Sequence, residues 1–270
     1  MQGSLGEKIG EGASADVHAW APGQVVKLFR SGFPRRLALH EFRMTRDVFA
    51  TGVPTPEAFD VVALNGRHGI VLSRLDGPTL KQLSQTGAMT HGQVGTILAN
   101  LAIAVHRTPP PSDMPLLRDD MEARLRFSGG SLPEHITEAI LPLIPRLAPG
   151  DGLCHGDLHS GNVIMTAEGA RLIDWTGATR GPAALDLAIS HVVLSEIAPE
   201  MVPDPERPRA VNAALQSEYA RLSGSSPTTL VALVEPYLSV ARIFALLAGT
   251  APGQRQQLIQ RVEASLHPQD

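Results

Sequence analysis

One short segment in the middle of the chain concentrates residues that could carry out phosphoryl transfer. It reads His155-Gly156-Asp157-Leu158-His159-Ser160-Gly161-Asn162, and Asp174 follows in Leu172-Ile173-Asp174-Trp175. The pattern predicts a loop between short strands that presents Asp157 and Asn162, followed by a strand end that presents Asp174. Phosphoryl transfer needs a carboxylate that orients the attacking hydroxyl and accepts its proton. It also needs oxygen ligands that hold Mg²⁺ on the nucleotide phosphates.

Other interpretations of this segment remain open at this point. An aspartate in a glycine-rich loop often serves only to cap a turn. His155, Asp157 and His159 alternate along the chain and could instead bind Zn²⁺ in a metal-dependent hydrolase. Cys154 could be a thiol nucleophile, although a small apolar residue at a strand end is its more ordinary role.

A glycine-rich segment near the N-terminus could approach phosphate groups. Gly10, Gly12, Ser14 and Val17 belong to the sequence Gly10-Glu11-Gly12-Ala13-Ser14-Ala15-Asp16-Val17. It predicts a loop between two strands whose backbone N–H groups could cradle phosphates. An ordinary hairpin would have the same composition, and Ala15 stands where a third glycine would be expected.

A lysine and a glutamate complete the set of candidate residues. Lys27 follows two valines on a predicted strand, and only 3 of the 23 basic residues are lysines, so this choice is uncommon in the chain. A charge on a buried strand needs a partner, and an ammonium suits phosphate oxygens. Glu41, on the next predicted helix, could pair with Lys27 or could lie on a solvated helix surface.

Together these residues resemble the aminoglycoside phosphotransferase family of kinase-like small-molecule kinases, over nearly the whole chain. The resemblance implies Asp157 as catalytic base, Asn162 and Asp174 as magnesium ligands, and Lys27 bound to ATP phosphates. It also implies an adenine-binding hinge near Arg74 and Leu75. His155 would then order the loop, and Asp186 would support it from behind. A non-catalytic kinase-like binding module is the remaining rival, and GTP could replace ATP as donor.

The elements that must position these residues change in character along the chain. Predicted strands Asp16–Trp20, Gln24–Phe29, Phe59–Leu64 and Gly69–Leu72 surround a predicted helix at Pro34–Ala50. After Gly77 the pattern is mostly helical, with helices expected at Gln93–His106, 118–127, 133–147 and throughout Pro182–His267. A short β-like segment at 153–174 interrupts them. The sequence therefore predicts an α+β, two-lobed kinase-like fold, with a β-rich lobe at 1–76 and a helical lobe at 77–270.

Composition excludes several other classes of protein. The 270 residues are 43% hydrophobic and carry a net charge of -4, which suits a globular enzyme and gives no electrostatic support for nucleic-acid binding. One cysteine cannot form an internal disulfide, and Met1–Gly12 has no apolar signal-peptide core. The apolar stretch Thr228–Ala251 contains Glu235, Pro236 and Arg242, so we expect a buried helix, no membrane contact and a cytoplasmic protein. Composition does not fix the oligomeric state.

The nature of the acceptor is less constrained. Asp174 and Asp186 are only twelve positions apart, which leaves little room for a platform that docks a peptide, so we expect a small hydroxyl compound. Candidates are an aminoglycoside or other antibiotic, an amino alcohol and a sugar. Residues 77–270 carry 14 Lys and Arg against 19 Asp and Glu; this acidic excess could attract a cationic acceptor or could belong to an ordinary solvated surface. The acids that could line its pocket are Asp119, Asp120, Glu122, Glu196 and Glu200. The resemblance implies acidic residues near the C-terminus in members that act on aminoglycosides, and here the tail offers only Asp270, so antibiotic resistance has no support from it.

Overall fold

The computed structural model describes residues 5–12 and 14–266, and the chain divides into two compact units. The first unit comprises Met1–Leu80 and Gly161–Gly177, and the second comprises Lys81–Ser160 and Ala178–Asp270. The lobe boundaries expected from composition, 1–76 and 77–270, remain a prediction. The compact units differ from them chiefly by grouping Gly161–Gly177 with the first. The reason is backbone pairing, because the Met165 and Leu172 N–H groups donate to the carbonyls of Pro78 and Pro54.

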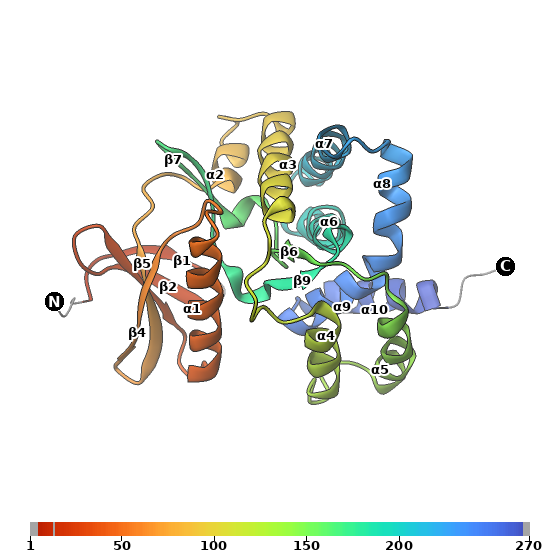
Figure 1. The fold of residues 1–270 in the computed structure, drawn as a ribbon, viewed down its shortest axis with the longest axis horizontal. Coiled ribbons are helices and arrows are strands. Elements are labelled where there is room, and N and C mark those ends of the chain that lie inside the picture. Colours follow the sequence, from red (N-terminus) through yellow and green to blue (C-terminus); the bar gives the residue numbers. More distant parts are fainter. Residues whose placement is uncertain (1–4, 13, 267–270) are drawn as a thin grey trace. The chain divides into compact units, whose positions relative to one another are not determined.

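A five-stranded antiparallel sheet forms the first unit, in the order β1-β2-β3-β5-β4 (Figure 1). The turn between β4 and β5 places Asn65 and Gly66 at φ 49° and 75°, the paired positive values of the tight hairpin turn that the Asn-Gly sequence predicts. The strands are β1 (Lys8–Glu11), β2 (Ala15–Ala19), β3 (Gln24–Phe29), β4 (Ala58–Leu64) and β5 (Arg67–Ser73).

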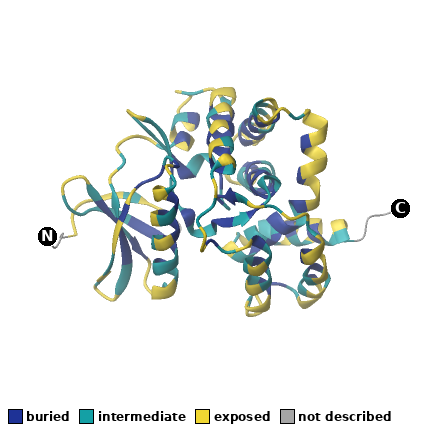
Figure 2. Ribbon diagram, viewed as in Figure 1, coloured by how far each residue is buried: buried dark blue, intermediate teal, exposed yellow. Residues whose placement is uncertain are grey.

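Helix α1 (Arg35–Ala50) packs against β4 and β5 and closes the core of this unit. Its buried positions include Ala38, Glu41, Thr45 and Val48, which recur every three or four residues and so lie on one face of the helix. Figure 2 shows the buried residues of this unit gathered in the sheet and along that helix. Glu41 therefore lies on the apolar face, where a carboxylate requires a partner.

A two-stranded hairpin completes the first unit. Strand β7 (Val163–Thr166) pairs with β8 (Gly169–Leu172), so that Val163 lies opposite Leu172. This register puts the residues just before β7 and just after β8 at the same, open end of the hairpin.

The second unit is mainly helical. Helix α3 carries a capping box at its start, with Thr90 and Gln93 bonded reciprocally. It packs closely on α7, and Gly95 permits this approach because a Cβ there would lie 2.4 Å from the Cβ of Ala214. The elements are α2 (Leu80–Gln85), α3 (His91–Arg107), α4 (Leu117–Arg126), α5 (Glu134–Ile140), β6 (Gly152–Cys154), β9 (Thr179–Gly181), α6 (Ala183–His191), α7 (Glu206–Ser223), α8 (Pro227–Val234), α9 (Leu238–Ala248) and α10 (Pro252–Leu266).

Two predicted helices are interrupted in the structure. The helix expected at 133–147 is α-helical only as far as Ile140 and continues as a 3₁₀ helix to Arg146, because Pro142 and Pro145 cannot donate the α-helical bonds. The tail expected to be helical from Pro182 is divided into several helices, including a π-helix at Val192–Ile197. His267, its predicted end, lies outside the described residues.

The apolar stretch expected as one buried helix is also divided. Pro227–Ala248 is long and apolar enough to span a membrane by length and composition, and 39% of its most apolar window is buried. A 3₁₀ turn at Glu235–Tyr237 separates α8 from α9, and the Arg242 guanidinium forms an ion pair with Glu196 at 2.8 Å. A proline and a paired internal charge are features of a helix pair in a folded domain.

Candidate active site

The catalytic-loop residues of the second unit are held by a buried aspartate. The loop begins where β6 ends, and the N–H groups of His155 and Gly156 donate to the two carboxylate oxygens of Asp186 at 2.6 and 2.7 Å. The N–H of Asp157 donates to the Nδ1 of His155, whose ring is fully buried. These bonds fix three consecutive backbone positions, as expected if His155 and Asp186 order the loop.

The side chain of Asp157 extends from this fixed backbone toward solvent. It is 44% exposed, and His159 Nε2 lies 3.4 Å from its Oδ1. Gly156 just before it has φ 78°, a conformation that favours glycine and allows the chain to turn sharply there. An accessible carboxylate on an ordered backbone has the character that a general base requires.

The two predicted magnesium ligands belong to the open end of the β7–β8 hairpin in the first unit. Asn162 directly precedes β7, and its carbonyl accepts a bond from the Ile173 N–H at 2.9 Å. Asp174 is the next residue, so the register brings an amide and a carboxylate to one end of one hairpin. Both offer oxygen ligands, the donor type that Mg²⁺ prefers, and the pair therefore fits that ion chemically.

Lys27 lies between two carboxylates of the same unit. Its Nζ is 2.6 Å from Glu41 Oε1 and 3.2 Å from Asp174 Oδ2, so the predicted Lys27–Glu41 ion pair is present. Burial acts to lower the pKa of Lys27, but the charges of Glu41 and Asp174 outweigh it and hold that pKa above its ordinary value. Lys27 is therefore a permanent cation directly beside a predicted metal ligand.

The residue Thr176 connects the two carboxylates that flank Lys27. Its Oγ1 lies 2.9 Å from Glu41 Oε2 and 2.9 Å from Asp174 Oδ1, and its carbonyl is 3.1 Å from His40 Nε2. Asp174 itself has φ 66°, in the left-handed region that non-glycine residues seldom occupy. Backbone strain of this kind is concentrated at functional sites, which agrees with the role expected of Asp174.

The glycine-rich segment forms the connection between β1 and β2. Gly10 pairs with Val17, and the Gly12 N–H donates to the Ala15 carbonyl at 2.8 Å. Ser14 accepts a bond from the Arg30 N–H through its carbonyl. Ala13 lies outside the described residues. Val17 also pairs with Lys27 on β3, so one register connects this loop with the lysine.

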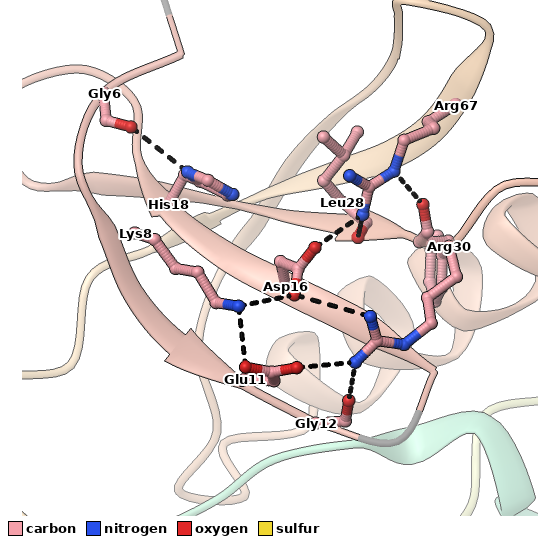
Figure 3. Close-up of polar contacts among 10 residues, drawn as sticks. Gly6, Lys8, Glu11, Gly12, Asp16, His18, Leu28, Arg30 and Arg67 are labelled. Atoms are coloured by element: carbon pink, nitrogen blue, oxygen red, sulfur yellow. Dashed lines mark hydrogen bonds and ion pairs between the residues drawn. The ribbon is translucent and has the colours of Figure 1, made fainter.

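A network of charged side chains surrounds this loop, and its members were not predicted from the sequence (Figure 3). Arg30 donates to the Gly12 carbonyl at 3.0 Å and to Glu11 Oε1 at 2.9 Å. Arg67 donates to Asp16 at 2.8 Å, and Lys8 Nζ lies 3.1 Å from the same carboxylate. The hydrogen bond from Arg67, followed by that from Lys8, lowers the pKa of Asp16 to about 2.

The predicted adenine hinge follows β5. The Arg74 N–H is already bonded to the Gly23 carbonyl at 2.9 Å, and the Arg74 guanidinium forms an ion pair with Asp76 at 2.7 Å. Leu75 is the next residue and is half-buried. If this hinge binds adenine, a backbone group other than the Arg74 N–H must donate to the base.

The geometry gives no support to a zinc hydrolase. Among residues 5–12 and 14–266, no three His, Cys, Asp or Glu side chains are grouped so that they could hold a metal ion. His155 is buried with its Nδ1 engaged by the loop backbone. Burial raises the pKa of the Cys154 thiol well above its ordinary value, as expected for a packed residue and not for a nucleophile.

Most of the acids expected to attract a cationic acceptor are already paired. Glu196 is buried and accepts two bonds from Arg242, with Arg261 Nη1 3.3 Å away. Asp120 is paired with Arg124 at 2.6 Å. Glu196 is therefore unavailable as a free negative charge, because arginine neutralises it within the protein.

Asp119 has a different environment. It lines a cavity of about 700 Å³ in the second unit, together with Arg118, Asp151 and Arg180. Of the last two acids, Glu122 lies 3.6 Å from Arg126 and Glu200 is exposed, while Asp270 lies outside the described residues. The equal numbers of acidic and basic side chains at this cavity give it no clear preference for a cation.

Comparison with known proteins agrees with these features. Residues 6–224 match the phosphotransferase enzyme family. A thiamine kinase of Escherichia coli O157:H7 is 27% identical over 179 residues, which are 63% of this chain and 58% of that protein. The chain thus matches little more than half the length of this relative.

Solved structures show the same fold. The choline kinase of Cryptosporidium parvum Iowa II superposes with a TM-score of 0.58 at 14% identity, covering 99% of this chain and 92% of that one. The streptomycin–ATP complex of aminoglycoside phosphotransferase APH(2″)-IIa superposes with a TM-score of 0.57 at 15% identity, covering 97% and 91%. The predicted kinase-like fold, with a β-sheet region followed by a helical region, is confirmed. The chain belongs to the phosphotransferase enzyme family.

Proposed function

We propose that this protein is an ATP-dependent kinase of a small molecule, which transfers the γ-phosphoryl group to an acceptor hydroxyl. The observation that carries the proposal is the Lys27 ammonium held 2.6 Å from Glu41 and 3.2 Å from Asp174, at the hairpin end that also bears Asn162. A buried cation beside a magnesium-type ligand pair is suited to a nucleotide polyphosphate. Family membership supports the same reaction class.

In the proposed reaction the acceptor hydroxyl oxygen bonds to the γ-phosphorus, and the bond from that phosphorus to the bridging oxygen of ADP breaks. Asp157 accepts the hydroxyl proton, and Lys27 binds phosphate oxygens and keeps the donor in place. Asn162 and Asp174 would hold Mg²⁺, which when bound neutralises charge on the phosphates. Glu41 contributes by fixing the Lys27 ammonium. Backbone N–H groups of the Gly10–Val17 segment would bind the phosphates as well.

The identity of the acceptor is proposed from chemistry shared by the relatives. Thiamine and choline, named in two of them, are both cationic alcohols, and streptomycin in the third is a polycation with many hydroxyls. We therefore propose a cationic hydroxyl compound as acceptor, bound by the helical unit. Because Glu196 and Asp120 are already paired with arginines, they do not provide the negative charge that would bind a cationic acceptor.

Use of ATP further suggests a cytoplasmic location. Antibiotic resistance would follow only if an aminoglycoside is the acceptor.

A nucleotide-consumption screen tests this proposal. Purified protein with Mg²⁺ and either ATP or GTP is given thiamine, choline, streptomycin, other aminoglycosides and neutral sugars. Products are identified by the added mass of one phosphate. The Asp157→Asn variant is the matched control for contaminating kinases. Nucleotide binding without turnover on any acceptor would favour a non-catalytic binding module instead.

A further inference from the structure

A buried chain of hydrogen bonds in the second unit extends from Asp186 away from the catalytic loop. His106, near the end of α3, has its Nε2 3.1 Å from Asp186 Oδ2. Its Nδ1 lies 2.8 Å from the hydroxyl of Tyr219 on α7, and the two rings meet edge to face at 5.5 Å. All three side chains are buried: Asp186 is 0% exposed, the His106 side chain 5% and Tyr219 6%.

The direction of each hydrogen bond in this chain can be assigned. Burial acts to raise the pKa of Asp186, but the bond from His106 and the other donors outweigh it and lower that pKa, so the group is an anion and only accepts. The His106 Nε2 must therefore carry a proton and donate. Burial, then the charge of Asp186, raises the pKa of Tyr219 to about 12, so its hydroxyl keeps its proton and can donate to Nδ1.

The consequence for the loop follows from how Asp186 is used. One carboxylate binds two consecutive N–H groups, those of His155 and Gly156, and so determines the backbone from which Asp157 extends. A carboxylate can bind two such groups only in a narrow range of side-chain orientations. The donation from His106 to Oδ2 selects one of these, and Tyr219 holds the His106 ring in the tautomer and orientation that make this donation possible.

We propose that His106, oriented by Tyr219, is a positioning residue for the catalytic loop and acts on Asp157 through Asp186. The inference rests on the proposed function insofar as Asp157 is the base. It predicts a particular kinetic effect. Disturbing the pair displaces the base but leaves the nucleotide-binding residues of the other unit intact. Loss should therefore appear in kcat and not in nucleotide affinity.

The test uses three variants and one matched control. His106→Leu removes the donor, whereas His106→Gln offers an amide N–H in place of Nε2–H. Tyr219→Phe keeps the ring and removes only the hydroxyl. Val105→Ala is the control, because Val105 is the neighbouring residue of α3, is 1% exposed, and loses packing but has no side-chain group that could hydrogen-bond to Asp186. We expect His106→Leu to lower kcat by about 10- to 100-fold, since displacement of a catalytic group by about 1 Å can cost that much.

His106→Gln should recover much of that loss, and Tyr219→Phe should show a smaller loss of the same kind. The dissociation constant for nucleotide should stay near the wild-type value in all three. If His106→Leu does not fold, Tyr219→Phe and His106→Gln carry the comparison. Equal kcat values for Leu and Gln at position 106, or a loss confined to KM for ATP, would overturn the proposal.

Hydrogen exchange provides a readout that does not depend on any acceptor. The amides of His155 and Gly156 should exchange faster in His106→Leu and Tyr219→Phe than in Val105→Ala, at conditions where all are folded. Unchanged protection of these two amides would overturn the positioning role, even for an active enzyme. If the screen finds no phosphotransfer at all, the proposed function fails, while the exchange experiment still decides the role of His106.

Discussion

Replacing Lys27 by methionine separates its structural role from its role in binding phosphate. Methionine keeps the length and apolar stem but removes the charge, so the buried Glu41 carboxylate, 3% exposed, loses its ion-pair partner at 2.6 Å. Removing one member of a buried ion pair typically costs about 3–5 kcal/mol. At about 2–4 °C per kcal/mol for a chain of this size, the melting temperature should fall by roughly 6–20 °C.

The double variant Lys27→Met/Glu41→Gln should regain most of that stability. Glutamine carries no charge and can still accept the bond from Thr176, whose Oγ1 lies 2.9 Å from Glu41 Oε2. Phosphotransfer should remain lost in the double variant, because no ammonium is left for the nucleotide phosphates. Thermal and urea unfolding measure the first effect, and isothermal titration with nucleotide measures the second.

Two controls make this experiment decisive. Lys81→Met removes an exposed lysine at the surface of the second unit, and it should leave the melting temperature nearly unchanged. Lys27→Arg keeps the charge but should still lower kcat/KM for ATP, because the planar guanidinium does not fit the space of an ammonium. A double variant no more stable than Lys27→Met would refute the coupling of the pair. Wild-type ATP kinetics in the double variant would refute the phosphate role.

Three further predictions concern the other charged groups. Asp157→Asn should lower kcat by about 10²–10⁴ with little change in nucleotide affinity, as steady-state kinetics and calorimetry can show. Asp174→Ala should weaken Mg²⁺-nucleotide binding more than Asn162→Ala, because only the carboxylate carries a full charge, and equal losses in a magnesium titration would contradict this. Because the pKa of Asp16 is lowered to about 2, its stabilising contribution is complete above about pH 4 and is lost as the pH falls toward 2. Arg67→Ala should therefore flatten the fall in stability over this range in urea unfolding, and an unchanged slope would argue against the ion pair.

Local pattern was sufficient to predict much of the first unit. The run Gln24–Phe29 has the apolar and β-branched content of a strand, and β3 has these bounds. The Lys27–Glu41 pair could be anticipated because both positions fall on buried faces, by period two in the strand and by period three to four in the helix. A buried Glu41 carboxylate needs a cation, and Lys27 lies 2.6 Å from it.

Contacts between residues distant in sequence could not be predicted in this way. Arg30 and Arg67 look like surface arginines in the sequence, yet both bond to backbone carbonyls within the unit, at Gly12 and at Phe29. His106 occupies a polar position near the end of a helix, and its partners Asp186 and Tyr219 are 80 and 113 residues away. Such partnerships depend on how helices pack, which the periodicity of any single helix does not encode.

The conformation of Asp174 connects the local pattern with the proposed chemistry. It is one of two non-glycine residues with positive φ among those described, and the other, Asn65, belongs to a tight hairpin turn that favours asparagine. Asp174 lies outside such a hairpin turn. The left-handed conformation costs about 1–2 kcal/mol for an ordinary L-residue and less for aspartate or asparagine, which adopt it more readily. The compensating contacts are the ion pair with Lys27 and the hydrogen-bonding distance to Thr176. A glycine at position 174 would adopt this backbone conformation without strain, but it would have no carboxylate. An aspartate held there by the candidate phosphate-binding lysine is therefore better explained by a need for the carboxylate than by the needs of folding.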